Sequence, residues 1–168
     1  CYEDSTMASL CECLVSPKGK EESTVMTKSL SSMILLLQTT VAKASGQIER
    51  LDELDNILAL DQHVVEEADR LAKEVVNTND FNKTILLGMS SYSGIALEGC
   101  LKLKEMANVW TESFGTLEFR HGPKSLVNQG THIVLLLSEE SREYELKVAQ
   151  EMISYGAFVT IITSSKNQ

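Results

Sequence analysis

In the second half of the chain, short apolar segments rich in β-branched residues alternate with segments of helical periodicity, and this alternation constrains the fold most strongly. The expected strands are 84–89, 110–114, 132–137 and 158–163, with one expected helix ending at Ala107 and another at 142–154. Strands that are apolar along nearly their whole length are typical of a parallel sheet with helices on both faces. The sequence therefore predicts an α/β fold, a three-layer αβα sandwich built on a parallel sheet.

The first half of the chain lacks this alternation and is expected to be largely helical. A short strand is predicted at 12–16, a helix at 23–44 that Ser45 and Gly46 end, and one or two surface helices at 48–76, broken near Leu60 and Asp61. The domain organisation expected from these segments is a first unit at 1–46, connecting helices at 47–80 and a second unit at 81–168.

The charge of the chain limits its partners. The 168 residues include 15 Lys and Arg against 24 Asp and Glu, a formal charge of −9. A net-negative surface gains no counterion release from a polyanion, so neither nucleic acid nor an anionic membrane is an expected partner. A small anion is admissible where Lys102, Arg120, Lys124 and a serine-rich turn gather locally.

Neither a membrane-spanning segment nor a targeting signal is expected. The apolar runs are far shorter than the ~20 residues that a bilayer requires, and no signal sequence begins the chain, so we expect a cytoplasmic protein. The cysteines Cys1, Cys11, Cys13 and Cys100 form no paired C-x-x-C set and are expected to be free, buried thiols. Cys1 is not followed by the Gly-rich start that an N-terminal nucleophile would favour.

Segment 96–106, with the sequence ALEGCLKLKEM, is the most informative predicted helix because its charges fall on one face. At 100° per residue, Glu98, Lys102 and Glu105 lie within about 60° of one another, whereas Lys104 points elsewhere. The stripe is expected at the margin of a core, where partial burial strengthens electrostatic interactions. Two interpretations stay open: a functional charged site, or a solvated Glu–Lys pair that contributes a few tenths of a kcal/mol.

A second candidate site is the loop in which Arg120 and His121 precede Gly122 and Pro123, with Lys124 next. Gly and Pro hold an irregular backbone, and such loops often present a functional side chain. Neighbouring cations favour the neutral imidazole of His121, which is a suitable general base near neutral pH. By contrast, His63 in an acidic helical stretch is expected at the surface, and His132 at the head of a strand is expected to be structural.

Two groups of hydroxyl residues are further candidates. Ser90, Ser91 and Ser93 form a strand-to-helix turn that can cradle an anion through backbone N–H groups, or that is a plain turn with Ser93 as the N-cap. Thr27 and Lys28 are polar among apolar neighbours, either as part of a binding site or as a solvated face.

Taken together, the segment GIALEGCLKLKE at 94–105 and the RHGP motif at 120–123 resemble the sugar isomerase (SIS) domain family. Within that family they are most similar to the isomerising half of glucosamine-6-phosphate synthase, to ketose/aldose phosphosugar isomerases and to aminosugar-phosphate deaminases. Segment 19–29, GKEESTVMTKS, resembles the end of the first of two SIS units. The resemblance implies the tail of a first SIS unit and most of a second, each a flavodoxin-like parallel sheet.

The resemblance also implies residue roles. Glu105 matches the base that moves a proton between C1 and C2 of an open-chain hexose phosphate, and Glu98 matches a supporting carboxylate. Lys102 matches a lysine near the sugar oxygens. His121 matches the residue that assists ring opening and that reaches the site from the neighbouring subunit, so a homodimer with a shared site is expected. Chemistry agrees, because moving a carbonyl requires one base that reaches two adjacent carbons and a cation where enediolate charge develops.

The resulting hypothesis is a phosphosugar isomerase, or an aminosugar-phosphate isomerase/deaminase, that acts on a hexose 6-phosphate without metal or cofactor. Candidate substrate-binding residues are Ser90, Ser91, Ser93, Thr27, Lys28 and Arg120. One alternative is a non-catalytic SIS module that senses a sugar phosphate, and another is a structural α/β domain with a solvated charged face. The chain contains no copy of the family's Ser-x-Ser-Gly-x-Thr phosphate loop, so it is expected to be part of a longer protein or to depend on a partner.

Overall fold

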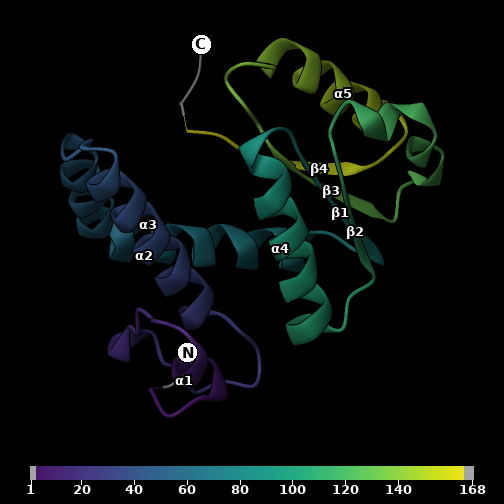
Figure 1. The fold of residues 1–168 in the computed structure, drawn as a ribbon. Coiled ribbons are helices and arrows are strands. Elements are labelled where there is room, and N and C mark those ends of the chain that lie inside the picture. The colour runs from purple at the N-terminus through teal and green to yellow at the C-terminus, as the bar shows by residue number, and fades with distance from the viewer. Residues whose placement is uncertain (1–2, 165–168) are drawn as a thin grey trace. The chain divides into compact units, whose positions relative to one another are not determined.

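The computed structural model describes residues 3–164, without the side chains of residues 58–61, so Cys1 lies outside the described residues. The chain divides into two compact units, residues 1–72 and 73–168. In chain order the elements are α1 (Thr6–Leu10), η1 (Pro17–Gly19), α2 (Lys28–Ala44), α3 (Glu49–Thr78), β1 (Lys83–Gly88), α4 (Ser91–Ala107), β2 (Thr111–Phe114), η2 (Glu118–His121), η3 (Pro123–Leu126), β3 (Thr131–Leu136), α5 (Arg142–Ser154) and β4 (Phe158–Ile162), where η marks a 3₁₀ helix (Figure 1).

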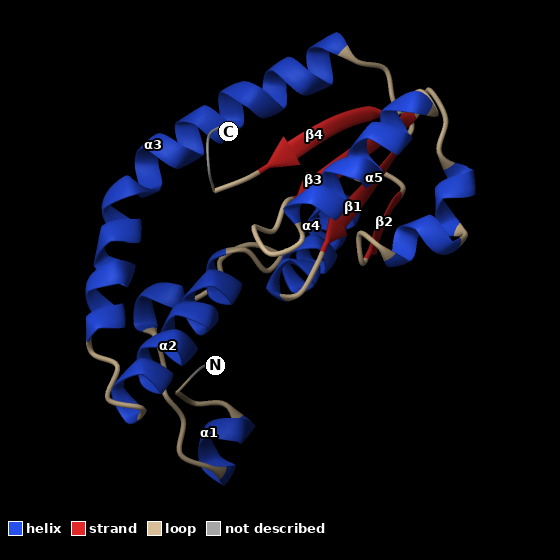
Figure 2. Ribbon diagram, turned by 90° about the horizontal axis from the view of Figure 1, so that it is seen from above, coloured by secondary structure: helices blue, strands red, loops and turns tan. Residues whose placement is uncertain are grey.

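The second unit contains a four-stranded parallel sheet with the strand order β2-β1-β3-β4 (Figure 2). In the central register, Ile85 of β1 stands opposite Glu112 of β2 on one side and Ile133 of β3 on the other. Helix α4 connects β1 to β2, and α5 connects β3 to β4. The prediction of an α/β fold with a parallel sheet is therefore confirmed.

Helices cover both faces of this sheet, because successive side chains of a strand point to opposite faces. One face buries a cluster that includes Ile85 and Leu135 with Val148 and Met152 of α5. The other face buries a smaller cluster, whose members are Leu86, Leu136, Ala96 and Cys100, the last two from α4. Figure 1 shows the two helices on opposite sides of the strands, so the predicted three-layer αβα arrangement is confirmed.

The chain connections run to opposite sides of the central pair β1 and β3: from β1 the chain continues to β2 at one edge of the sheet, and from β3 it continues to β4 at the other edge. In open parallel sheets, ligands bind beyond the carboxyl ends of the strands at such a switch point. Here those ends are followed by the serine turn that starts at Ser90 and by the loop that starts at Ser138. The topology therefore places the predicted serine turn at the edge where a ligand is expected.

The first unit departs from the prediction at two places. Residues 12–16 form no strand, and within residues 3–164 no other strand pairs with them. Helix α2 begins at Lys28 rather than Ser23, because the Glu21 carboxylate accepts hydrogen bonds from the amides of Thr27 and Ser29, at 2.8 and 3.1 Å, and fixes the first turn there. Its predicted end is confirmed, with Ser45 as the C-cap and Gly46 at φ 73°.

Helix α3 is continuous over 30 residues, so the break predicted near Leu60 and Asp61 is absent from the backbone. The segment contains no Gly or Pro, and pairs such as Gln62 with Glu66 and Arg70 with Glu67 support its surface at helical spacing. In the part of the chain that the structure describes, no helix combines the length and the hydrophobicity that a membrane span requires.

The cysteines at 11, 13 and 100 are free, as predicted, but only Cys100 is buried. Cys11 is exposed and Cys13 is partly exposed, with 3.7 Å between their Sγ atoms. The expectation of buried thiols is wrong for these two, because the described part of unit 1 buries little apolar surface around them.

Candidate functional site

The charged stripe on α4 forms as predicted. The Lys102 ammonium lies 3.3 Å from Glu98 Oε1 and 2.7 Å from Glu105 Oε2. The hydrogen bond to Glu105 is the main reason that the pKa of Lys102 is raised. Because Ala96 and Cys100 pack against the sheet, the three charged residues lie on the opposite, outward side of α4, rather than at the margin of this core as expected.

These three side chains are neither buried nor freely solvated. Their exposed fractions are 33% for Glu98, 20% for Lys102 and 38% for Glu105. Lys102 therefore holds both carboxylates in place while Glu105 stays accessible to a ligand. Lys104, two positions further on, is more exposed and belongs to no ion pair among the described residues, in agreement with its predicted direction.

The serine turn between β1 and α4 is tightly built. Ser90 adopts φ 50° and ψ −123°, and the Tyr92 amide donates to the Met89 carbonyl at 2.9 Å, which closes a type II′ turn. A Cβ at Gly88 would lie 2.5 Å from the Tyr92 carbonyl oxygen, so glycine is required where the strand passes the first helical turn.

The three serines differ in what they can offer a ligand. Ser90 occupies the N-cap position, whereas the Ser93 hydroxyl donates to the Ser90 carbonyl at 2.6 Å from inside α4. The alternative of Ser93 as the N-cap is therefore wrong. The side chains of Ser90 and Ser91 are exposed and make no hydrogen bond to another residue of the described chain.

A cavity of about 410 Å³ adjoins this turn at the carboxyl end of β2. It is lined by Ser93, Gly94, Leu97, Ser113, Phe114, Gly115 and Glu118. Ser113 and Glu118 were not singled out from the sequence. Ser113 is the next-to-last residue of β2, before its carboxyl end at Phe114, and Glu118 begins η2 four residues beyond that end, so their position at the carboxyl end of a parallel strand is the signal that could have found them. The cavity lies beside the first turns of α4, the helix that carries Glu98, Lys102 and Glu105.

His121 ends the short helix η2 and is followed by Gly122, whose φ of 143° suits glycine alone. Its imidazole is exposed, and within residues 3–164 no hydrogen bond or ion pair joins it to the charged stripe of α4. Two positions earlier, Phe119 is fully buried in the cluster on the α5 side of the sheet. The histidine is thus carried by an anchored segment but presented to solvent.

The cations beside His121 are engaged by one carboxylate of α5. Glu151 accepts a hydrogen bond from Arg120 Nε at 2.9 Å and from Lys124 Nζ at 2.6 Å. The contact with Lys124 is the main reason that the pKa of Glu151 is lowered and that the pKa of Lys124 is raised. Lys102 is paired on α4, across the sheet, so the cations do not gather into one anion site within this unit.

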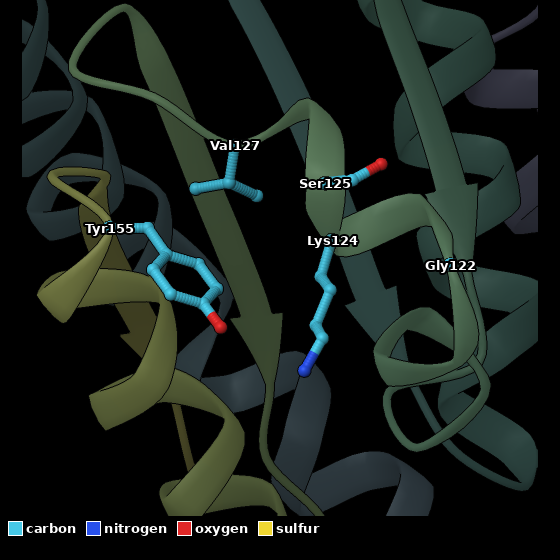
Figure 3. Close-up of a pocket in the computed structure, with 5 residues that line it drawn as sticks. All are labelled: Gly122, Lys124, Ser125, Val127 and Tyr155. Carbon is cyan, nitrogen blue, oxygen red and sulfur yellow. The ribbon is translucent and has the colours of Figure 1, made fainter.

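A second cavity, of about 530 Å³, lies between the η3 turn and the end of α5. Its lining residues are Gly122, Lys124, Ser125, Val127 and Tyr155. Figure 3 shows Lys124 and Tyr155 entering it from two different elements, while the Ser125 hydroxyl is turned away. The Tyr155 hydroxyl also donates to Glu151 at 3.1 Å.

Thr27 and Lys28 stand at the start of α2, in the first unit, and both are exposed. The amides that an anion would use there already donate to Glu21, and these bonds lower the pKa of Glu21 to about 2. The helix start is therefore occupied by a carboxylate from the chain itself.

The remaining histidines lie as predicted. His132 is buried in β3, 2.9 Å from Thr160 Oγ1 and packed between the rings of Phe81 and Phe158, and burial lowers its pKa. His63 is exposed on α3. Among the described residues, no three or more His, Cys, Asp or Glu side chains are placed to hold a metal ion.

Residues 79–168, more than half of the chain, match the family described as the SIS domain. The chain belongs to the SIS domain family. This SIS domain begins just before β1 and contains the α4 stripe, the serine turn and His121. The resemblance to that family seen in the sequence motifs is confirmed.

Known SIS proteins share both sequence and fold with the chain. It is 31% identical over 163 residues to the isomerizing glutamine–fructose-6-phosphate aminotransferase of Caulobacter vibrioides, covering 88% of the chain and 26% of that relative. It superposes on the crystal structure of glucosamine-6-phosphate deaminase from Thermotoga maritima with a TM-score of 0.79 at 32% identity, over 96% of the chain and 50% of that structure. For tagatose-6-phosphate ketose/aldose isomerase from Escherichia coli, the TM-score is 0.55 at 25% identity, over 63% of the chain and 30% of that structure. The chain thus spans about a quarter of the curated relatives and half of the deaminase.

Proposed function

We propose that this SIS domain belongs to a phosphosugar isomerase, or to an aminosugar-phosphate isomerase/deaminase, that acts on a hexose 6-phosphate by 1,2-proton transfer. The observation that carries the proposal is the Lys102 ammonium held between Glu98 and Glu105 on the outward face of α4. The known relatives support the substrate class, because the names of all three contain a hexose 6-phosphate.

In the proposed reaction, the Glu105 carboxylate removes the proton from one of the two carbons next to each other at the head of the open-chain sugar. The electron pair of that C–H bond forms the carbon–carbon double bond of an enediolate or enolamine, and negative charge develops on the former carbonyl oxygen. The Lys102 ammonium donates a hydrogen bond to that oxygen. Glu105 then returns the proton to the neighbouring carbon, while the hydroxyl on the first carbon gives its proton to the enediolate oxygen, so the carbon–oxygen double bond moves by one position. In the enolamine the amino group gives up a proton in the same way, and a carbon–nitrogen double bond forms instead.

Glu98 acts in this proposal on Lys102 rather than on the sugar, since its carboxylate lies 3.3 Å from the same ammonium. His121 assists opening of the sugar ring before the proton transfer. Because His121 has no contact with the α4 stripe among the described residues, we propose that it serves the site of a second subunit in a homodimer. The serines of the β1–α4 turn remain the predicted contacts for the sugar phosphate. Thr27, Lys28 and Arg120 stay predictions that the geometry favours less, because Glu21 already accepts hydrogen bonds from the first amides of α2 and Glu151 accepts one from Arg120.

The test is turnover by the full-length protein of fructose 6-phosphate, with and without ammonia, and of glucosamine 6-phosphate. Glu105→Gln keeps the shape of the side chain but removes the base, so we expect turnover to fall by about 10²–10⁴-fold. Lys102→Met should also reduce turnover strongly, whereas Lys104→Met, on the same helix, is the matched control and should leave it unchanged. Wild-type turnover in Glu105→Gln would exclude the role proposed for this residue.

The same samples separate catalysis from sensing. If a hexose 6-phosphate raises the melting temperature of the full-length protein while no product forms from any substrate, the domain binds the sugar as a regulatory module instead.

A further inference from the structure

Glu151 of α5 binds the two cations that flank His121 in the sequence, Arg120 directly before it and Lys124 three positions after it. Its two carboxylate oxygens are divided between them, with Oε2 2.9 Å from Arg120 Nε and Oε1 2.6 Å from Lys124 Nζ. Tyr155 donates a third hydrogen bond to Oε1 at 3.1 Å. The exposed fraction of the Glu151 side chain is 20%, so the contact is partly shielded from solvent.

Further contacts fix the segment on the N-terminal side of the histidine. Phe119 is fully buried in the same cluster as Val148 and Met152 of α5. Before it, Thr116 donates to the buried Glu145, also of α5, at 2.8 Å. Beyond the histidine, Lys124 is the cation that ties the chain to α5, through Glu151.

His121 itself has no such anchor. Its imidazole is exposed and makes no hydrogen bond to another described residue, and the next residue, Gly122, has the most permissive backbone of any residue type. Arg120 and Lys124 repel each other, and this repulsion opposes the rise in the pKa of Lys124. Glu151 offsets this repulsion, because its carboxylate accepts a hydrogen bond from each cation and ties both side chains to α5.

We propose that Glu151 is a positioning residue for His121, which holds Arg120 and Lys124 on the two sides of the histidine and so directs the imidazole toward the sugar ring. The inference rests on the proposed function in one respect, the use of His121 in ring opening. Arg120 then acts through Glu151 on the position of the histidine.

The test compares two substrates of the full-length protein that differ in the C5 hydroxyl and therefore in the need for ring opening. Fructose 6-phosphate must open its ring, whereas 5-deoxyfructose 6-phosphate lacks the hydroxyl that closes the furanose and is already open. Glu151→Ala should lower kcat on fructose 6-phosphate by about 10-fold, with KM within twofold, and should change turnover of the open-chain substrate by less than twofold. His121→Ala should show the same selectivity, and Glu151→Asp should recover part of the loss.

Glu143→Ala is the matched control, since Glu143 is an exposed glutamate of the same helix and its replacement removes the same charge. It should behave as wild type on both substrates. Equal losses on both substrates in Glu151→Ala would mean that Glu151 serves stability alone, and wild-type rates on both would overturn the proposal directly.

A second measurement does not depend on activity. The Hε1 NMR signal of His121, assigned with His121→Ala, should shift or broaden in Glu151→Ala, while the buried His132 signal stays unchanged. If His121→Ala fails to discriminate between the substrates, the ring-opening role is wrong, and the NMR signal still decides whether Glu151 holds the histidine. An unchanged His121 signal would overturn the positioning role whatever the kinetics show.

Discussion

Glu145 offers the sharpest test of how the second unit is held together. It is fully buried on α5, and its carboxyl oxygens accept hydrogen bonds from the Thr116 hydroxyl at 2.8 Å, from the Ser138 amide at 3.1 Å and from the Ser138 hydroxyl. Thr116 is fully buried and Ser138 is 8% exposed, so water cannot readily replace the lost acceptor. Glu145 therefore joins the ends of β2 and β3 through α5.

Glu145→Ala leaves the Thr116 hydroxyl and the Ser138 amide without their acceptor inside the protein. Each buried group left without a partner costs about 1–3 kcal/mol, so the two donors together account for about 2–6 kcal/mol. We therefore expect the free energy of unfolding to fall by about 2–6 kcal/mol, a large share of the ~5–15 kcal/mol that stabilises a typical domain. Glu145→Gln keeps one acceptor oxygen and should lose about 1–3 kcal/mol.

The assay is unfolding in guanidinium chloride, followed by circular dichroism and by the fluorescence of Trp110, the one tryptophan of the chain. The midpoint should fall while the m-value stays constant. Glu143→Ala, on the exposed side of α5, should stay within about 0.5 kcal/mol of wild type. In a double-mutant cycle, Glu145→Ala should cost less in a Thr116→Val background, because one donor is then already gone. A loss below about 1 kcal/mol in Glu145→Ala would refute the reasoning.

The stability of the protein should depend on pH through two residues whose pKa values are shifted, Glu21 and His132. The pKa of Glu21 is lowered from 4.5 to about 2, so the ionised carboxylate contributes fully to the free energy of unfolding above pH 4.5. This contribution disappears as the pH falls toward 2, and the stability difference between wild type and Glu21→Gln should shrink over that range. A constant difference would contradict the capping role. Burial lowers the pKa of His132 below 6.5, so on acidification the unfolded state binds a proton at a higher pH than the folded state does. The free energy of unfolding should therefore decline as the pH drops below about 6.5. The decline should be smaller in His132→Gln, and an equal decline in that variant would show that other groups cause it.

The sheet and its helices were accessible from the sequence because their signals are local. Predicted strand 84–89 and helix 142–154 correspond to β1 and α5, the helix with the same bounds. Both owe their identity to apolar periodicity and to the small residues at their ends. The strand predicted at 12–16 is the contrasting case, because a strand requires a hydrogen-bonding partner that a local pattern does not supply.

The α4 stripe was also predictable, since residues at i, i+4 and i+7 share a face of any helix. The start of α2 was not, because it depends on Glu21, which lies outside the helix and folds back onto its first amides. Similarly, the break predicted in α3 followed a polar stretch that the helix tolerates without interruption.

By itself, then, the sequence determined the parallel α/β architecture, the family and the charged face of α4, because helical and strand periodicity fix which side chains share a surface. Only the tertiary structure decided that Arg120 and Lys124, the cations near His121, both pair with Glu151. Glu151 follows Arg120 by 31 positions and Lys124 by 27, and only the packing of α5 onto the sheet brings its carboxylate to both. An ion pair between distant segments leaves no periodic trace, because its geometry is set by the fold that carries its two ends.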